Sequence, residues 1–487
     1  MPTQPIIFAN IQQSGWSQLA GAPGPAINVV MDGRGAVRRR PVITTSDNAL
    51  TTAVDSTGIA LIRSTLGGDI YVVNGDSSYR KVYAVTKTGS RDLSPVALKT
   101  LVGGLRPQVA ETEALLVLAG GSDMQKVDLT SDPVACTRLG GGPPDASHVI
   151  ANDARVLAND MVTDRTKTRF SEKSLGTASY SGHETWNFGG TGTSGFFSAE
   201  SRPDPVEALG ETTNEVFVFG STNVEVHRAD NQSITRAYAV GATREYGCSA
   251  PYSPVKVDQA YGWIDHLRRI VVSDGRTFEV ISKEIQPVLD DMDTVSDAFG
   301  YRVHQGTIDC LVWCFPTDGR TFAYQRGAGW STWMGWDEAA NNWSRFKVNC
   351  HHHAPTTDEN LVGTTDGFVG KLVMGGTEDL GVQVPASVET GFLDRGSDNL
   401  KQCKSIRVTL QRGTTSTAEV CHVRYKDKPG EWSEPLPVRL GVAGDTDPVV
   451  VFYSLGTYRR RAWKFEFSAA QDLVLASVTE QYEVLGQ

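Results

Sequence analysis

The sequence predicts an all-β fold whose main part is a β-propeller of six or seven blades. A short phrase recurs around Asp274-Gly275, Asp318-Gly319 and Asp366-Gly367, each time between two apolar runs. Asp-Gly suits a tight hairpin, because a type I′ turn needs positive φ at both central residues. The phrases recur at roughly 45 residues, which is the spacing of propeller blades. Helical periodicity is nearly absent from the chain.

The same pattern of paired apolar runs separated by turn residues begins near residue 50, so we expect the propeller to span residues 51–380. Further sheets are predicted from paired apolar runs at 59–62 with 70–73 and 82–85, at 114–118 with 124–129, more weakly at 148–170, and at 215–220 with 224–228. The sequence does not distinguish a six-bladed from a seven-bladed propeller.

Two stretches interrupt the repeated pattern of paired apolar runs. Residues 171–205 are rich in Gly, Ser and Thr, and we expect an inserted long loop that is functional or contacts a partner. Residues 326–346 contain the tryptophans Trp330, Trp333, Trp336 and Trp343. Packing between blades is the favoured interpretation of this aromatic segment, and a subunit interface is the alternative.

The two ends differ from the propeller pattern. Residues 1–50 show little periodicity and many Gly and Pro residues, which predicts an N-terminal arm with the first strands. The arm contains Arg38, Arg39 and Arg40, whose side chains alternate in extended backbone; an ion-paired or solvated face is therefore favoured over nucleic-acid contact. Residues 381–487 alternate apolar and polar side chains, which predicts a separate C-terminal β-sandwich.

Composition restricts the class of protein. The 487 residues include 49 glycines, with 40% hydrophobic and 21% charged residues, as in a globular chain with many turns. A net charge of −10 argues against gripping nucleic acid through its phosphates, but it is compatible with lining a passage for DNA. No apolar run approaches the ~20 residues of a membrane span and no signal peptide is visible, so we expect no stable membrane insertion.

The sequence predicts no catalytic, cofactor-binding or metal-binding residue, and no enzyme. The seven cysteines are scattered without a CxxC pair, and we expect reduced, buried thiols. Cys350 and His351 to His353 look like metal ligands, but consecutive strand residues point to alternate faces and cannot converge on one ion. A solvated or stacked histidine cluster is favoured, and an ion held by His351 to His353 at a subunit interface stays open.

The repeated phrases also leave one enzymatic alternative open. The repeated phrases are similar to the Asp-box turns of sialidase-type propellers, although Ser, Asp and Gly are adjacent here and the spacing differs. A glycosidase would also need an arginine triad and a nucleophilic tyrosine at the propeller centre. The alternative function is therefore a propeller-type glycan-binding or glycosidase (sialidase-like) protein, for which the fold alone is no argument.

Two segments carry a family resemblance. Residues 198–205 read SAESRPDP, and residues 215–225 read EVFVFGSTNVE. Supporting features are Ile27-Asn28 with Arg39-Arg40-Pro41, Trp330 to Trp333, and residues 456–467. With them, most of the chain resembles, at low identity, the tail hub proteins of short-tailed bacteriophages of the Salmonella podovirus type. These are also called packaged-DNA stabilisation or head-completion proteins.

The resemblance implies a structural, non-enzymatic role. Such proteins form a homo-hexamer beneath the portal and its adaptor, the head-to-tail connector, where they close the filled head and line the DNA channel. They also contact tail spikes or fibres and a needle or plug protein, while double-stranded DNA passes without specific binding. For this chain it implies assembly in the host cytoplasm, a place in the virion tail and a part in genome ejection.

Overall fold

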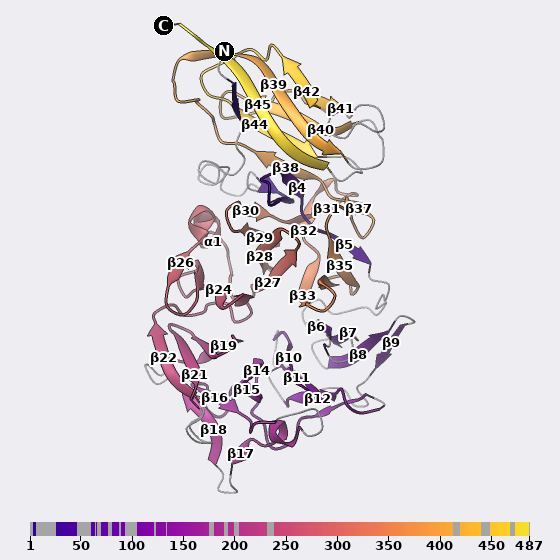
Figure 1. Ribbon diagram of the computed structural model, residues 1–487, viewed down its shortest axis with the longest axis vertical. Helices are drawn as coiled ribbons and strands as arrows, with labels where there is room; N and C mark the ends of the chain where they lie inside the picture. The colour runs from indigo at the N-terminus through magenta and orange to yellow at the C-terminus, as the bar shows by residue number, and fades with distance from the viewer. Residues whose placement is uncertain are drawn as a thin grey trace.

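The computed structural model confirms a nearly all-β chain (Figure 1). The structure describes residues 3–5, 26–45, 60–63, 65, 70–75, 80–86, 89–92, 105–120, 123–132, 134–174, 180–188, 193–198, 204–230, 238–412, 419–439, 449–467 and 473–486. Within these ranges the helices are α1 (Gln286–Asp290) and the 3-10 turns η3 (Ser181–Glu184) and η4 (Ser282–Glu284). None of them has the length and apolar character needed to span a bilayer.

Seven successive antiparallel sheet units make up the lower body in Figure 1. In chain order they are β6–β9 (Ala60–Arg63, Ile70–Gly75, Arg80–Thr86, Gly89–Asp92); β10–β13 (Gln108–Glu111, Leu115–Ala119, Gln125–Asp128, Cys136–Arg138); β14–β18 (Val149–Asn152, Arg155–Asn159, Lys167–Phe170, Asn187–Phe188, Thr193–Ser198); β19–β22 (Val206–Glu211, Glu215–Gly220, Val224–Ala229, Tyr238–Arg244); β23–β26 (Val255–Val257, Ala260–Ile264, Ile270–Ser273, Phe278–Val280); β27–β30 (Phe299–Gln305, Ile308–Phe315, Arg320–Gln325, Gly329–Thr332); and β33–β35 (Val348–Ala354, Glu359–Thr364, Val369–Val373) with β5 (Val42–Thr45).

The first strands of these units face a common centre. Strand β33 lies beside β6, β6 beside β10, β10 beside β14, and β14 beside β19, while β23 lies beside β27 and β27 beside β33. The units starting at β19 and β23 share an aromatic core that includes Phe217, Phe219 and Trp263. The last unit takes its outer strand from the N-terminal segment, because β5 pairs with β35 from Val42↔Val373 to Thr45↔Gly370. Strands from the predicted arm are therefore built into the body.

The repeated Asp-Gly phrases do form hairpin turns, but the predicted type I′ geometry is wrong. Strand pairs β25–β26, β28–β29 and β34–β35 meet at these turns. Among the described backbone, Gly275, Gly319 and Gly367 have positive φ (84°, 64° and 86°), while the preceding aspartates do not. Asp274 instead accepts hydrogen bonds from the N–H groups of Arg276 and Thr277 at 2.9 and 2.7 Å, so the loop is longer and side-chain capped.

The C-terminal residues form two sheets that share one core. One sheet has the order β3 (Val29–Met31), β4 (Val37–Arg39), β45 (Leu473–Leu485), β39 (Leu400–Arg412) and β42 (Val449–Tyr453), with β1 (Thr3–Pro5) on β45 and β43 (Thr457–Tyr458) on β39. The other contains β38 (Ala386–Glu389), β44 (Ala462–Phe467), β40 (Glu419–Lys426) and β41 (Leu436–Arg439). Ile406 and Val408 of the first sheet pack in one cluster with Val423 and Phe465 of the second. These are the inward positions that the alternation predicts.

Strand β2 (Ala26–Ile27) joins the two parts. It pairs in parallel with β30 at Ile27↔Thr332 and antiparallel with β38 at Ala26↔Val388. The result is one nine-stranded sheet that runs from β27 in the lower body to β41 in the C-terminal part. Two small hairpins flank this junction: β31 (Met334–Asp337) with β32 (Asn342–Arg345), and β36 (Glu378–Asp379) with β37 (Val382–Gln383).

The predicted long loop at 171–205 is partly wrong, since it contains η3 and strands β17 and β18. Strand β18 is hydrogen-bonded to β16, from Phe170↔Gly195 to Lys167↔Ser198. Trp186 is buried and donates its indole N–H to the carbonyl of His183 at 3.1 Å. Scattered Gly, Ser and Thr residues concealed this strand, because they lack the apolar alternation that marks a half-buried strand. Residues 175–179, 189–192 and 199–203 lie outside the described chain.

Candidate functional site

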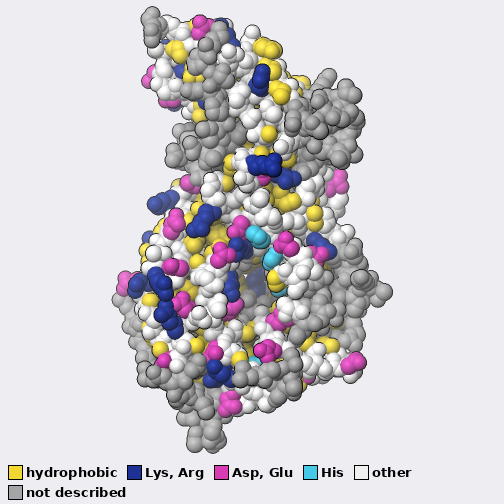
Figure 2. Space-filling view, in the orientation of Figure 1, with side chains coloured by type: hydrophobic (Ala, Val, Ile, Leu, Met, Phe, Trp, Pro, Cys, Tyr) yellow, Lys and Arg dark blue, Asp and Glu magenta, His cyan; other side chains and the backbone are white. Residues whose placement is uncertain are grey.

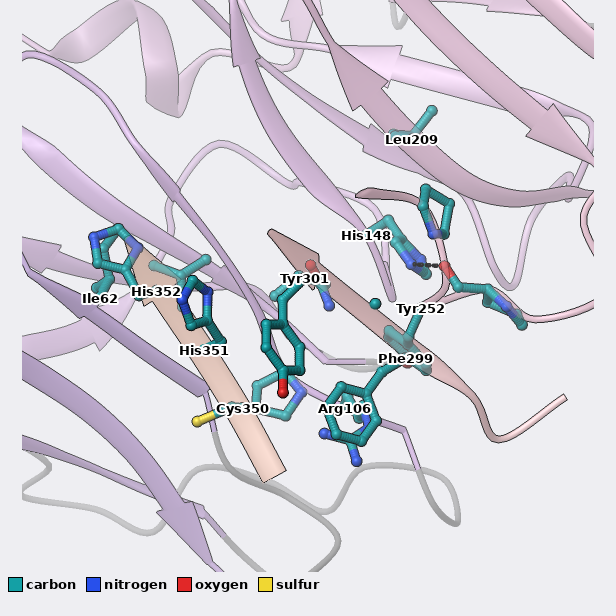
Figure 3. A pocket seen from close by; sticks show the side chains of 16 residues that line it. Ile62, Arg106, His148, Leu209, Tyr252, Phe299, Tyr301, Cys350, His351 and His352 are labelled. Atoms are coloured by element: carbon teal, nitrogen blue, oxygen red, sulfur yellow. Dashed lines mark hydrogen bonds between the residues drawn. The ribbon is translucent and has the colours of Figure 1, made fainter. Parts of the chain in front are cut away.

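The first strands of the sheet units enclose a cavity of about 250 Å³ at the centre of the ring. Figure 2 shows the body hollowed at this point, with histidine side chains at the rim. Residues from several units line it, as Figure 3 shows: Ile62, Arg106, His148, Leu209, Tyr252, Phe299, Tyr301, Cys350, His351 and His352. Because these residues come from all seven sheet units, either from the first strand or from the segment just before it, the cavity depends on the whole ring.

Arg106 supplies the positive charge in this cavity. Its Nη1 donates to the carbonyl of Asn349 at 2.5 Å, and its Nη2 donates to Oδ1 of the same residue at 2.9 Å. The guanidinium lies 3.8 Å above the centre of the Phe299 ring. Burial lowers the pKa of Arg106 to about 10, so the side chain remains charged at neutral pH.

Two cavity histidines are neutral at physiological pH. The His148 Nε2–H donates to the carbonyl of Pro251 at 3.0 Å, and its ring stacks on Tyr252 at 5.0 Å. Burial lowers the pKa of His148 to about 4 and that of His351 to about 3. His351 Nε2–H donates to Oδ1 of Asn360 at 3.1 Å and stacks on Tyr301 at 4.8 Å. These rings act as fixed walls rather than as charged groups.

The consecutive histidines do not separate as strict alternation predicts, because the adjacent His351 and His352 both line the cavity. His351 stacks inside the ring on Tyr301, whereas His353 donates to the carboxylate of Asp358 at 3.1 Å in an exposed contact. Among the described residues, no group of three or more His, Cys, Asp and Glu side chains has the geometry of a metal site. An ion shared between subunits stays a hypothesis.

All seven cysteines are free and buried, which confirms the predicted reduced thiols. Burial raises the pKa of Cys350, in the cavity wall, to about 12. A thiol with such a pKa is protonated at neutral pH and is a poor nucleophile.

The described lining of the cavity contains one arginine, Arg106, and no carboxylate. An arginine triad of the sialidase type is therefore not assembled from these residues. Sequence reasoning missed Arg106 and His148 because each stands alone in its segment. Only the ring brings them together.

A second set of residues fixes the junction between the two parts. Arg40 is completely buried and forms an ion pair with Asp379 at 2.5 Å, with the guanidinium 4.3 Å from the centre of the Phe346 ring. Asn28 accepts hydrogen bonds at Oδ1 from Nε of Arg40 (2.9 Å) and from the N–H of Met334 (2.7 Å). Its Nδ2 donates to the carbonyl of Pro385 at 2.9 Å. The ion-paired interpretation of the arginine triplet is thus observed for Arg40.

Asp204 connects the two segments that carry the family resemblance. Its carboxylate accepts hydrogen bonds from the backbone N–H groups of Ser221 (3.0 Å), Thr222 (2.8 Å) and Asn223 (2.9 Å), and from the Ser221 hydroxyl. The turn between β20 and β21 is therefore capped by the end of the preceding motif. Residues 199–203 of that motif lie outside the described chain.

The aromatic segment divides into two pairs. Trp330 and Trp333 are buried and donate their indole N–H groups to the Ile281 carbonyl and the Ser331 hydroxyl. Trp336 and Trp343 are half-buried, 5.2 Å apart in an edge-to-face pair on the β31–β32 hairpin. They line a groove of about 600 Å³ with Trp432 and other residues of the C-terminal part. Core packing is confirmed for the first pair only.

Three comparisons with known proteins bear on the chain. No curated protein matches it. Among solved structures, one chain from the complex of an S. cerevisiae Dbp5 variant bound to Nup159, a Gle1 variant, IP6 and ADP is similar at a TM-score of 0.37 and 8% identity, covering 71% of this chain and 97% of that chain. Kluyveromyces lactis Hsv2p has a TM-score of 0.29 at 8% identity, covering 56% and 92%. An exo-beta-1,3-galactanase from Phanerochaete chrysosporium with galactose has a TM-score of 0.25 at 10% identity, covering 93% and 100%.

The family comparison is more informative. Residues 191–371 match the model of a phage stabilisation family described as the β-propeller of bacteriophage P22 Gp10. The matched segment contains the Asp204-capped turn and all three Asp-Gly turns. The match supports a β-propeller in this all-β chain and a structural phage protein of the tail-hub type.

Proposed function

We propose that the chain is a subunit of the tail hub, or nozzle, of a short-tailed phage, which closes the DNA-filled head below the portal and its adaptor. The observation that carries the proposal is the family match over residues 191–371, which includes the contact of Asp204 with the 221–223 turn. On this proposal the protein is structural and not an enzyme. The seven sheet units are the blades of a seven-bladed propeller, and the two C-terminal sheets form a β-sandwich.

The continuous sheet at the junction suits a subunit that transmits force. A nine-stranded sheet crosses from propeller to sandwich, and the buried Arg40–Asp379 pair lies beside it. Separate domains joined by a flexible linker would move relative to one another. A hub that retains pressurised DNA needs a fixed spacing between its contacts to the adaptor and to the tail, and a continuous sheet supplies it.

The charge of the chain supports passage of DNA without binding. The net charge is −10, and an acidic channel wall repels phosphates at short range, since screening lengths are about 8 Å at physiological salt. We propose a homo-hexamer in the virion tail that forms such a channel and also contacts tail spikes or fibres and a needle or plug protein. Assembly takes place in the host cytoplasm.

Reconstitution tests this function. Purified chain is mixed with the portal–adaptor complex of the same phage, and the mass of the product is measured by analytical ultracentrifugation. We expect monomers alone and six copies per portal–adaptor complex. A chain that stays monomeric with the complex at micromolar concentration contradicts the proposal. The variant Asp132→Ala, at an exposed turn position, serves as a control for surface changes.

A further inference from the structure

Positive charge accumulates near the central cavity without an internal counter-ion. Arg106 lines the cavity, and Arg345, at the end of β32, is close enough to lower the pKa of Arg106 further. In the described chain no carboxylate pairs with either guanidinium, and the Nη2 atom of Arg345 is buried without a hydrogen-bond acceptor. Arg40, by contrast, forms an ion pair with Asp379.

The acidic groups that raise the pKa of Arg106 are the thiols of Cys350 and Cys314 and the phenol of Tyr252. None of them is a carboxylate. Burial raises the pKa of both thiols, that of Cys350 to about 12, so they carry protons at neutral pH. Arg106 is half-buried, and the two hydrogen bonds that its guanidinium donates to Asn349 are to neutral groups. Among the described residues its charge is therefore not paired with a carboxylate.

The cavity has the space and the donors to hold an anion. Its volume of about 250 Å³ exceeds the ~30 Å³ that one water occupies in the liquid several-fold. A guanidinium has five N–H donors, and the two bonds to Asn349 leave the others available. Figure 3 shows Arg106 beside Phe299 at one end of the cavity, with Tyr301 and His351 nearby. His148 and His351 bring no opposing charge.

We propose that the cavity at the centre of the ring binds an oxyanion of phosphate size, held by the guanidinium of Arg106 and favoured by the nearby charge of Arg345. Forked N–H donors match the oxygens of a tetrahedral anion, which makes an oxyanion a better fit than chloride. This site is separate from the structural role proposed above and stands or falls independently of it.

Equilibrium dialysis with radiolabelled inorganic phosphate, in chloride buffer free of other oxyanions, tests the proposal. We expect one phosphate per chain. Arg106→Gln, which removes the charge, is expected to weaken binding about tenfold or more. The matched control is Arg138→Gln, whose side chain is 69% exposed and paired with Asp123 at the surface; its binding is expected to equal that of the unmodified protein. Absence of binding, or equal binding by Arg106→Gln, overturns the proposal.

Two further measurements keep the test decisive if Arg106→Gln does not fold. Arg106→Lys keeps the charge but loses the fork, and we expect weaker phosphate binding than for arginine. For the unmodified protein, phosphate is expected to raise the Tm relative to chloride at equal ionic strength, because a ligand that binds only the folded state stabilises it. An unchanged Tm at a phosphate concentration far above the dialysis range contradicts the site.

Discussion

Asn28 and Arg40 are hydrogen-bonded to each other inside the junction between the lower body and the C-terminal sheets, with Oδ1 of Asn28 2.9 Å from Nε of Arg40. Both side chains are fully buried. Through Asn28 the pair also reaches Met334 and Pro385, and through Arg40 it reaches Asp379. Five residues from three separate segments of the chain thus meet at this junction.

Asn28→Ala is expected to lower the free energy of unfolding by about 3 kcal/mol or more, because three hydrogen bonds are lost in a buried site. Asn28 also has a φ of 56°, which an alanine adopts at a cost of about 1 kcal/mol and a glycine does not. Asn28→Gly is therefore expected to be the milder variant. Urea unfolding measures both, with exposed Asn399→Ala as control. Equal losses for Ala and Gly contradict the backbone argument.

Removing one partner of the buried Arg40–Asp379 pair is expected to destabilise more than removing both. Asp379→Leu alone leaves a buried guanidinium without its counter-ion, at a cost of about 3–5 kcal/mol. The double variant Arg40→Met with Asp379→Leu is expected to recover part of that loss, as measured in a double-mutant cycle by chemical denaturation. Purely additive effects would show that the two charges do not interact.

Asp204 makes the stability of the 221–223 turn depend on pH. Burial alone would raise the pKa of Asp204, but hydrogen bonds from Ser221, Thr222 and Asn223 together lower it below its ordinary value. The ionised form is thus favoured by folding, and its contribution is complete above the ordinary pKa of about 4. It is lost as the pH falls through the lowered pKa of the folded state. As the pH drops below about 4, the urea midpoint of Asp204→Asn is expected to fall less steeply than that of the unmodified protein. The same pH dependence of the urea midpoint in both proteins would contradict this.

The four tryptophans of the aromatic segment are expected to fall into two stability classes. Trp330→Ala or Trp333→Ala removes a buried indole and is expected to cost about 3–5 kcal/mol. Trp336→Ala or Trp343→Ala removes a half-buried one, and we expect a loss of about 1–2 kcal/mol. Thermal unfolding by circular dichroism distinguishes the classes. Similar losses at all four positions would mean that the hairpin pair is as deeply packed as the core pair.

The thiols are expected to be unreactive while the protein is folded. All seven cysteines are buried, and burial raises the pKa of Cys248 and Cys403 to about 12. Titration with an aromatic disulfide reagent at pH 8 is expected to label none of them in buffer and all of them in guanidinium chloride. Rapid labelling of one thiol in buffer would identify an opening of the fold at that position.

Sequence reasoning located strands well where side chains alternate or where Gly marks a turn. The hairpins at Asp274, Asp318 and Asp366 and the inward positions Ile406 and Val408 are examples. It failed where pairing partners are distant: nothing in residues 26–27 indicates that they lie between β30 and β38. Strand β18 was missed because its small and polar residues show no alternation.

The candidate site was harder to predict than the fold. Arg106 and Asn349 are far apart in the sequence and meet only across the ring. Burial then sets the charge states, with the pKa of His148 lowered to about 4 and that of Cys350 raised to about 12. Such shifts depend on desolvation in the assembled cavity, which no local motif encodes. The two segments that carry the family resemblance, residues 198–205 and 215–225, are in contact through Asp204 and Ser221, which the sequence alone does not indicate.

Localisation of the chain in the virion tests the central proposal most directly. A cryo-electron microscopy reconstruction of the phage particle, with this chain fitted into the density of the tail, provides the measurement. We expect six copies around the tail axis immediately below the adaptor, each with propeller and C-terminal sheets in the arrangement of Figure 1. Density in which this chain is absent from the head–tail axis would contradict it.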